Sequence, residues 1–172
     1  GGSLVCSDIE HIKANDDAAV LALTLYGANF SNVTINDAEL WGQGIGTLAK
    51  EDYGSVDETD SIMGVSLNNV TLHGSVYNGG LIANLTDIDL AIFGVTINGL
   101  SVPSAATNGG IIASMGDFTH SSSWGSVHIS DVSINGNMQA SGGVVGGIVG
   151  EVVGMSLTIE KVEFTGDLSG RI

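Results

Sequence analysis

Apolar and polar residues alternate along most of this chain in a short template that recurs. The template reads apolar, x, apolar, x, x, apolar, x, apolar, and its two stretches of period-two alternation are typical of short strands that bury one face. The central x positions hold bend formers such as Asn68-Asn69, Asn98-Gly99 and Ser130-Asp131. The copies are ANFSNVTI (28–35), VSLNNVTL (65–72), VTINGLSV (95–102), VHISDVSI (127–134) and LTIEKVEF (157–164), with a weaker one at LVCSDIEH (4–11).

The spacing of these copies predicts the architecture. Their starts near residues 4, 28, 65, 95, 127 and 157 are separated by 24, 37, 30, 32 and 30 residues. A repeat of this size cannot bury its apolar side alone, so repeats stack. We therefore predict an all-β parallel β-solenoid (β-helix) of about five to six coils of roughly 30 residues, forming a single domain over residues 1–172 with an excursion at 50–61. The alternative is an antiparallel β-sandwich, which also has short strands and frequent turns.

Stacked coils place like residues above like. In the aligned copies one core column contains Phe30, Leu67 and Ile97, together with Cys6, which we interpret as a small core residue and not as a nucleophile. On the outer face the alignment predicts a ladder of hydroxyl side chains, formed by Thr34, Thr71, Ser101 and Ser133. Such a ladder is a solvated sheet face or, as a less favoured alternative, an ice-binding surface.

A second recurring phrase predicts a third strand in each coil. Its copies are NGGLIAN (78–84), NGGIIAS (108–114), SGGVVGG (141–147) and, more loosely, DAAVLAL (17–23). We expect Leu81 or Ile82 to point into the core. The small residues are expected to let adjacent faces of the coil approach closely.

Charge and hydropathy narrow the function classes. Nineteen Asp and Glu against four Lys and Arg give a net charge of −15, which repels phosphate backbones, so we expect no nucleic-acid partner. The most apolar stretch, residues 142–155, is only fourteen residues long and contains Glu151, so we expect no membrane insertion. The sequence starts Gly-Gly-Ser without a signal-peptide pattern, from which we expect a processed form or a piece of a longer protein.

The C-terminal third, GGIVGEVVGMSLTIEKVEFTGDLSG (146–170), resembles the GLUG-motif repeats of large bacterial surface proteins. In that family a Gly-apolar-apolar-Gly strand is followed by a turn, a further strand and a glycine-containing ending. Here GIVG (147–150) matches the first part and TGDLSG (165–170) matches the ending, whereas earlier copies carry Ala83 or Ala113 at the second glycine. The resemblance implies an extracellular β-solenoid of a stalk, adhesin or filament, and it transfers no catalytic residue.

The acidic segment EDYGSVDETD (51–60) raises the question of calcium. Asp52, Asp57 and Asp60 are weak candidate ligands, because the segment lacks the Asp-x-Asp-x-Asp-Gly spacing that presents oxygens to one ion. A solvated excursion is the favoured interpretation, calcium is the lesser alternative, and no other cofactor is expected. The histidines fall in different columns and predict no metal site: His11, His73, His120 and His128.

No catalytic residue is predicted. Polysaccharide-cleaving β-helices gather several acids on one face of adjacent coils, whereas in the predicted register Asp37 and Glu39 have no acidic residue above them. A lyase or hydrolase is therefore a minor alternative. This alternative requires the fold to bring acids onto one face, and the acids concerned are Asp37, Glu39, Asp131, Glu160 and Glu163.

The remaining surface candidates concern sugars. Trp41, Tyr77 and Trp124 form a candidate ligand surface for a glycan, although they do not share a column. Sequons for N-glycosylation occur at Asn29, Asn32, Asn69 and Asn84.

The sequence as a whole favours a structural function. We expect an extracellular or cell-surface protein without catalysis, acting as a stalk, filament subunit or adhesin module. Open solenoid ends support head-to-tail self-association. The alternatives are a carbohydrate-binding or polysaccharide-degrading β-helix and, less favoured, an ice-binding solenoid.

Overall fold

The computed structural model of the chain describes residues 2–14, 19–26, 28–53, 59–103, 106–116 and 124–171. Within these ranges the regular elements are fourteen strands and no helix. The strands are β1 (Gly2–Ala14), β2 (Ala22–Tyr26), β3 (Ala28–Gly46), β4 (Ala49–Tyr53), β5 (Thr59–Met63), β6 (Ser66–Gly79), β7 (Ile82–Thr86), β8 (Asp89–Pro103), β9 (Thr107–Gly109), β10 (Ile112–Met115), β11 (Ser126–Gly146), β12 (Val149–Val152), β13 (Ser156–Thr165) and β14 (Leu168–Arg171).

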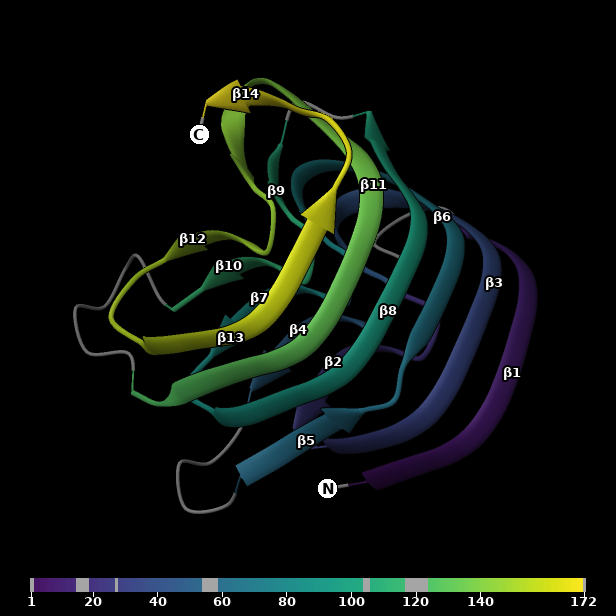
Figure 1. The fold of residues 1–172 in the computed structure, drawn as a ribbon, viewed down its shortest axis with the longest axis vertical. Coiled ribbons are helices and arrows are strands. Elements are labelled where there is room, and N and C mark those ends of the chain that lie inside the picture. Colours follow the sequence, from purple (N-terminus) through teal and green to yellow (C-terminus); the bar gives the residue numbers. More distant parts are fainter. Residues whose placement is uncertain are drawn as a thin grey trace.

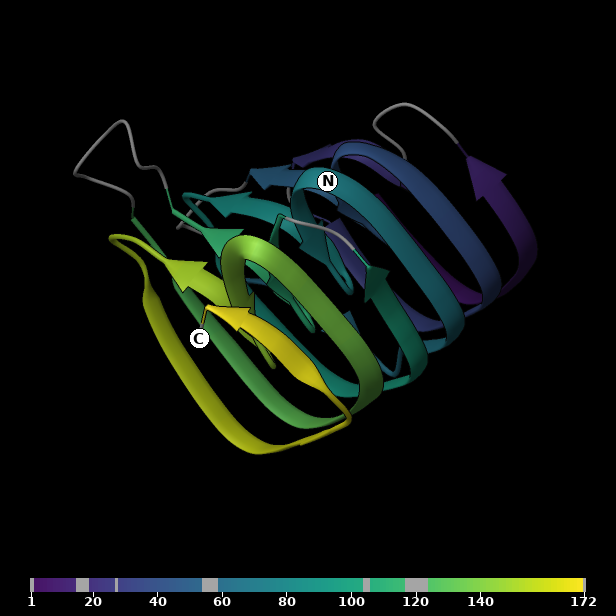
Figure 2. The same ribbon diagram turned by 90° about the horizontal axis from the view of Figure 1, so that it is seen from above.

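The strands form two sheets whose pairings are all parallel. The first sheet has nine strands in the order β1-β3-β5-β8-β6-β9-β11-β13, with β14 beside β11, and the second has five in the order β2-β4-β7-β10-β12. In each turn the chain follows the curved first sheet, turns tightly, crosses the second sheet and returns beside its own starting strand (Figures 1 and 2).

This arrangement confirms the predicted all-β parallel β-solenoid, and the antiparallel β-sandwich is wrong. β2 and β12 are four full turns apart. β1 lies at one end of these turns, and β13 and β14 lie at the other end. The coil count therefore differs slightly from the predicted five to six.

Columns of apolar side chains run along the solenoid axis and form its core. Strand pairing defines the first column as Phe30, Ile62, Ile92, Ile129 and Ile159. A second column consists of Ile35, Leu67, Ile97, Ile134 and Phe164. Every member before the last coil is buried, whereas Ile159 in the last coil is 44% exposed.

The predicted register is wrong by five residues for part of the chain. Phe30 pairs with Ile62, not with Leu67, because the template occurs twice in succession within a coil, as in LAIFGVTINGLSV (90–102), and a shift of five residues still matches it. Along the first column, from Leu4 to Ile159, successive paired residues are 26, 32, 30, 37 and 30 residues apart. The longest interval therefore follows Ile92 and does not contain the acidic segment at 50–61.

Two corners bend each coil along the first sheet, and residues with positive φ occupy them. The first corner holds Asn32, Gly64, Gly94, Asp131 and Lys161, and the second holds Asp37, Asn69 and Gly99. Glycine and asparagine adopt this left-handed conformation most easily, so the predicted bends are confirmed.

The register also moves Cys6 out of its predicted column. Leu4 pairs with Phe30, and Cys6 lies between the residues that pair with Ser31 and Val33. Its backbone therefore occupies the corner position equivalent to Asn32. The predicted column of Cys6 is wrong, because the backbone register of the first copy differs from the predicted one by two residues.

The phrase NGGLIAN (78–84) forms the tight turn between the two sheets. Gly79 ends β6, Gly80 and Leu81 make the turn, and Ile82 begins β7. A Cβ atom on Gly79 would overlap the carbonyl oxygen of Ile82, so glycine alone permits this approach. The predicted third strand and the burial of Leu81 and Ile82 are confirmed, but the glycine pair belongs to the turn.

The other copies of the phrase follow the same layout with two changes of alignment. Ala22 pairs with Ala49, which pairs with Ile82, so the predicted copy DAAVLAL (17–23) is one residue out of register. Ile82 pairs with Ile112, and Ile112 pairs with Val149. The copy in the last complete turn is therefore VGGIVGE (145–151), four residues after the predicted SGGVVGG (141–147).

Two fully buried asparagines support these turns. Asn78 Oδ1 accepts a hydrogen bond from the Gly74 amide (2.6 Å), and Asn78 Nδ2 donates to Asn108 Oδ1 (2.9 Å). Asn108 Nδ2 in turn donates to the Gln139 carbonyl (2.9 Å). Because buried polar groups must be hydrogen-bonded, this ladder fixes the register of neighbouring coils next to the turns at Gly79 and Gly109.

Candidate functional site

The outer face of the first sheet carries ordered polar ladders. The observed hydroxyl ladder consists of Thr34, Ser66, Thr96 and Ser133. The predicted members Thr71 and Ser101 are wrong, because both lie in the column of Glu39. Beside the hydroxyls, asparagine amides bond from coil to coil: Asn68 Nδ2 donates to Asn36 Oδ1 (2.8 Å) and Asn98 Nδ2 donates to Asn68 Oδ1 (3.2 Å).

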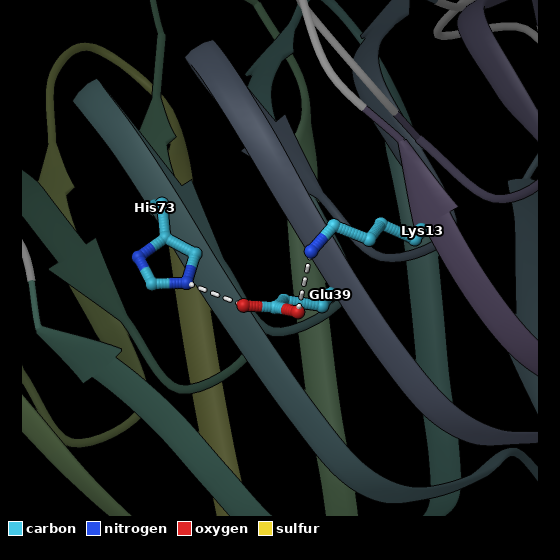
Figure 3. Close-up of polar contacts among 3 residues, drawn as sticks. All are labelled: Lys13, Glu39 and His73. Atoms are coloured by element: carbon cyan, nitrogen blue, oxygen red, sulfur yellow. Dashed lines mark hydrogen bonds and ion pairs between the residues drawn. The ribbon is translucent and has the colours of Figure 1, made fainter.

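A compact side-chain cluster joins the first three strands of this face (Figure 3). Lys13 of β1 and His73 of β6 both approach the carboxylate of Glu39 on β3, with Lys13 Nζ 3.5 Å from Oε2 and His73 Nε2 3.3 Å from Oε1. The Trp41 ring stacks on the His73 ring with 4.7 Å between centroids and 9° between planes. Lys13 Nζ lies 4.6 Å from the centroid of the Trp41 ring.

These contacts leave Trp41 unsuited to the role predicted from the sequence. Since β1 and β6 flank β3 on opposite sides, Lys13 and His73 cover opposite faces of the indole. A sugar ring stacks on an open aromatic face, and here both are occupied. The cluster is better suited to joining neighbouring coils through stacking and cation–π contact, because its exposed ion pair alone is worth little.

Truncation of Trp41 tests this interpretation. We expect Trp41→Ala to lower the free energy of unfolding by about 1–2 kcal/mol, since it removes the ring stack and the cation–π contact together. Trp41→Phe keeps part of both contacts and should cost less. Trp124→Ala is the control, because Trp124 is 68% exposed. Urea denaturation followed by far-UV circular dichroism measures all three, and equal losses for Trp41→Ala and Trp124→Ala would contradict the stabilising role.

The three predicted aromatic residues lie in different places. Trp124 precedes β11, and its amide donates to Asp87 Oδ1 (2.9 Å). Tyr77 lies near the end of β6, at a groove beside the glycine turns. Of the three residues only Tyr77 lines this groove, and a glycan surface formed by Trp41, Tyr77 and Trp124 stays a prediction.

A groove lies beside the turns, on the side of the solenoid. It has a volume of about 190 Å³ and lies where β3 and β6 diverge from β4 and β7. Its lining residues are Gln43, Gly44, Lys50, Glu51, Val76, Tyr77, Ala83 and Asn84. Lys50 Nζ lies 3.8 Å from Glu51 Oε1, so the positive charge at the groove has an acidic neighbour.

The polar groups of this groove are partly desolvated. Burial and, secondarily, the charge of Glu151 raise the pKa of Tyr77. Burial also raises the pKa of Glu151, against a hydrogen bond from Ser114 that lowers it. A concave site with a few convergent polar groups of perturbed pKa is the usual form of a ligand site.

Two of the candidate calcium ligands lie inside the core. Asp52 on β4 is 1% exposed and shares a column with Leu85, and Asp60 on β5 is 8% exposed and shares a column with Leu90. No hydrogen bond reaches Asp52 Oδ1 in the described structure. Burial first and the charge of Asp60 second raise the pKa of Asp52 from 3.8 to about 7. Asp57 lies outside the described residues.

The acids that would have to converge in a polysaccharide-cleaving site are spread over five columns. Asp37 and Asp131 occupy different corners, and Glu39 belongs to the Trp41 cluster. Glu163 pairs with Ser133, at the end of the hydroxyl ladder, whereas Glu160 pairs with Ser130. Across the described residues, no group of three or more His, Cys, Asp or Glu side chains is arranged to hold a metal ion. His128 is exposed and apart from His73; His120 and the side chain of His11 lie outside the described part.

The sequon asparagines differ in their surroundings. Asn29, Asn32 and Asn69 are exposed, with Asn32 and Asn69 at corners. Asn84 is half-buried in the groove. Exposed corners accommodate a bulky modification more easily than a groove, and glycosylation stays a prediction.

The fold and these sites define the protein as a parallel β-solenoid with polar outer ladders and a lateral groove. The chain matches no model of a known protein family, and neither curated proteins nor solved structures show a significant similarity to it. The resemblance to GLUG-motif repeats therefore stays a prediction. No helix in the described ranges has the length and apolarity needed to cross a bilayer.

Sequence reasoning missed the Lys13–Glu39–His73 contacts and the groove. The predicted register, which is wrong by five residues, did not place Trp41 beside His73. Both residues occupy outward positions of their repeats, so the correct register would have predicted their contact. The groove had no comparable signal, because its walls come from strands that meet only through the glycine turns.

Proposed function

We propose that this protein is an extracellular structural β-solenoid, a stalk, filament subunit or adhesin module whose coils continue by head-to-tail stacking of copies. The observation that carries the proposal is the exposure of the last coil. Ile159 is 44% exposed, whereas Ile129 in the preceding coil of the same column is fully buried. An apolar column that ends open fits a further coil.

The two ends are complementary in register. β1 and β13 are the edge strands of the first sheet, so each offers backbone groups to a parallel partner. Continuing the observed columns places Ile159 of one copy beside Leu4 of the next, and Phe164 beside Ile9. A contact of this kind is heterologous and, when it does not close, produces a filament.

Charge is the main force opposing this assembly. The net charge of −15 makes copies repel one another at low ionic strength. Salt screens such repulsion over a Debye length of about 8 Å at physiological ionic strength. Assembly should therefore increase with salt, whereas the apolar contact itself does not require ions.

The proposal is tested by one pair of substitutions on β13. We expect the wild-type chain to form elongated assemblies at high concentration and salt, and Ile159→Lys to remain a 17.4 kDa monomer because a charge then lies in the apolar end column. Thr158→Lys is the matched control, since Thr158 is exposed on the outer face of the same strand. Analytical ultracentrifugation and negative-stain electron microscopy report the outcome. Wild-type protein that stays monomeric at every salt concentration contradicts head-to-tail stacking.

The extracellular location rests on separate support. The sequons at exposed Asn32 and Asn69, the acidic composition and the GLUG-like C-terminal repeat favour it. Protease treatment of intact cells should release peptides of this chain. Recovery of those peptides only after lysis contradicts the location.

A further inference from the structure

The groove beside the glycine turns runs along the solenoid axis. Its two walls are the last residues of β3 and β6 on one side and the residues of β4 and β7 on the other. Parallel pairing continues both walls into the next coils: Tyr77 pairs with Thr107, and Asn84 pairs with Ser114, which pairs with Glu151. Polar side chains therefore recur along the solenoid axis at the inter-strand spacing of about 4.8 Å.

A ligand in this groove must be recognised through side chains. The groove runs across the strands, and most backbone groups of β3, β4, β6 and β7 are paired with neighbouring coils, apart from the register shift between Gly42 and Gly44 of β3. A peptide that adds to a sheet edge has no free edge here. The amides of Gln43 and Asn84 and the phenol of Tyr77 both donate and accept hydrogen bonds, which suits a ligand rich in hydroxyl groups.

The acidic side chains in and around the groove disfavour anionic ligands. The groove contains Glu51 beside Lys50, and Glu151 follows in the same wall. The chain as a whole carries −15, so phosphorylated or carboxylated ligands are repelled. A neutral ligand meets neither this repulsion nor the cost of desolvating its own charge.

The size of the groove indicates how much of the ligand it holds. Its volume of about 190 Å³ lies below the ~300–1,000 Å³ of pockets that enclose a whole drug-sized ligand. Gly44 and Ala83 are buried small residues at the bottom of the groove, so the ring of Tyr77 stands beside them as its main apolar wall. These dimensions suit a single ring of a longer chain, with an adjacent ring lying along Thr107, which is half-buried in the next coil.

We propose that the groove formed by Gly44, Tyr77, Ala83 and Asn84 is a binding site for a neutral polysaccharide chain lying along the solenoid axis. Tyr77 packs against one sugar ring, and the amides of Asn84 and Gln43 bond its hydroxyl groups. This assignment is independent of head-to-tail stacking, because the groove lies on the side of the solenoid and not at its ends.

The experiment is a titration of the full chain with five neutral hexasaccharides: cellohexaose, maltohexaose, mannohexaose, xylohexaose and chitohexaose. Isothermal titration calorimetry should detect binding of at least one. We expect Tyr77→Ala to weaken that binding tenfold or more and Tyr77→Phe about threefold, since the first removes the ring and the second only the hydroxyl group. Circular dichroism of each variant verifies that it is folded.

A second variant narrows the groove without removing any binding group. A Cβ on Gly44 would lie 3.6 Å from Lys50 Cε, an ordinary contact, so Gly44→Ala should fold and weaken binding by narrowing the groove. Trp124→Ala, which removes an exposed aromatic residue elsewhere, should leave binding unchanged.

Three results would overturn the assignment. The first is that none of the five hexasaccharides binds the folded wild-type chain. The second is that Tyr77→Ala and Gly44→Ala both bind as tightly as the wild-type chain, or that binding is lost in Trp124→Ala. The third is that a hexalysine peptide binds more tightly than every saccharide, which would make the groove a site for cationic chains.

Discussion

Gly109→Ala is expected to lower the free energy of unfolding by about 3 kcal/mol, the upper part of the range for overpacked sites. A Cβ atom on Gly109 would overlap the carbonyl oxygen of Ile112, and the same relation holds at the equivalent glycines of the other turns. The obstructing atoms belong to the backbone of the next strand, so no side chain can move aside. The turn itself must open.

Gly44, near the end of the equivalent strand in another coil, provides a matched control. Gly44 lies two residues before its turn glycine, has no positive φ, and an added Cβ there makes only ordinary contacts. Gly44→Ala should therefore stay within about 1 kcal/mol of wild type. Urea denaturation followed by circular dichroism compares both variants, and coincident unfolding curves would contradict the steric account of the turn.

The second large effect concerns Asp52 and pH. In the unfolded chain this carboxyl group loses its proton near its ordinary pKa of 3.8, whereas burial and the neighbouring Asp60 raise the pKa in the folded state to about 7. Between these values the folded state binds more protons, so stability falls as pH rises from about 4 to about 7 and is level above that. At 1.36 kcal/mol per pKa unit the loss is on the order of 4 kcal/mol, a large fraction of a typical domain's stability.

Replacement of the buried acid should remove this dependence. Asp52→Asn keeps the shape without the charge, and we expect it to be more stable than wild type at pH 8 and close to wild type at pH 4. Asp167→Asn, at an exposed position, is the matched control. Thermal unfolding across pH 4–8 measures both, and a wild-type midpoint that rises from pH 4 to pH 7 would contradict the assignment.

Calcium added to the same measurement tests the metal prediction made from the sequence. If the pair Asp52 and Asp60 holds calcium, the ion should raise the unfolding temperature of wild-type protein at pH 8 and should not do so in Asp52→Asn, because one of the two carboxylates is lost. An equal rise in both proteins would show that any bound calcium is held elsewhere.

Much of the architecture followed from local patterns. Period-two alternation, bend residues such as Asn69 and Gly99, and a repeat near 30 residues together require short parallel strands that stack. These features act through backbone preferences and burial, which each coil repeats in the same way. The class of fold was therefore predictable from one sequence.

The register between neighbouring coils was not predictable from the sequence in the way that the fold class was. The template fits itself after a shift of five residues, and the core accepts Leu67 or Ile62 equally well as a neighbour of Phe30. The choice depends on where the glycine turn closes each coil, and that closure involves contacts between backbones far apart in the chain. Errors at the hydroxyl ladder and around Trp41 follow from this one ambiguity, whereas the error at Cys6 comes from a separate shift of two residues in the first copy.

By itself the sequence determined the parallel β-solenoid, the positions of the bends and the highly acidic surface, because these depend on composition and on spacing within a coil. Only the tertiary structure decided which residues meet across coils: Lys13 and His73 on the two faces of Trp41, Asp52 buried near Asp60, and Tyr77 opposite Asn84 in the groove. The physical reason is that a solenoid forms its sites between coils, and lateral neighbours are fixed by register, which local preferences leave open.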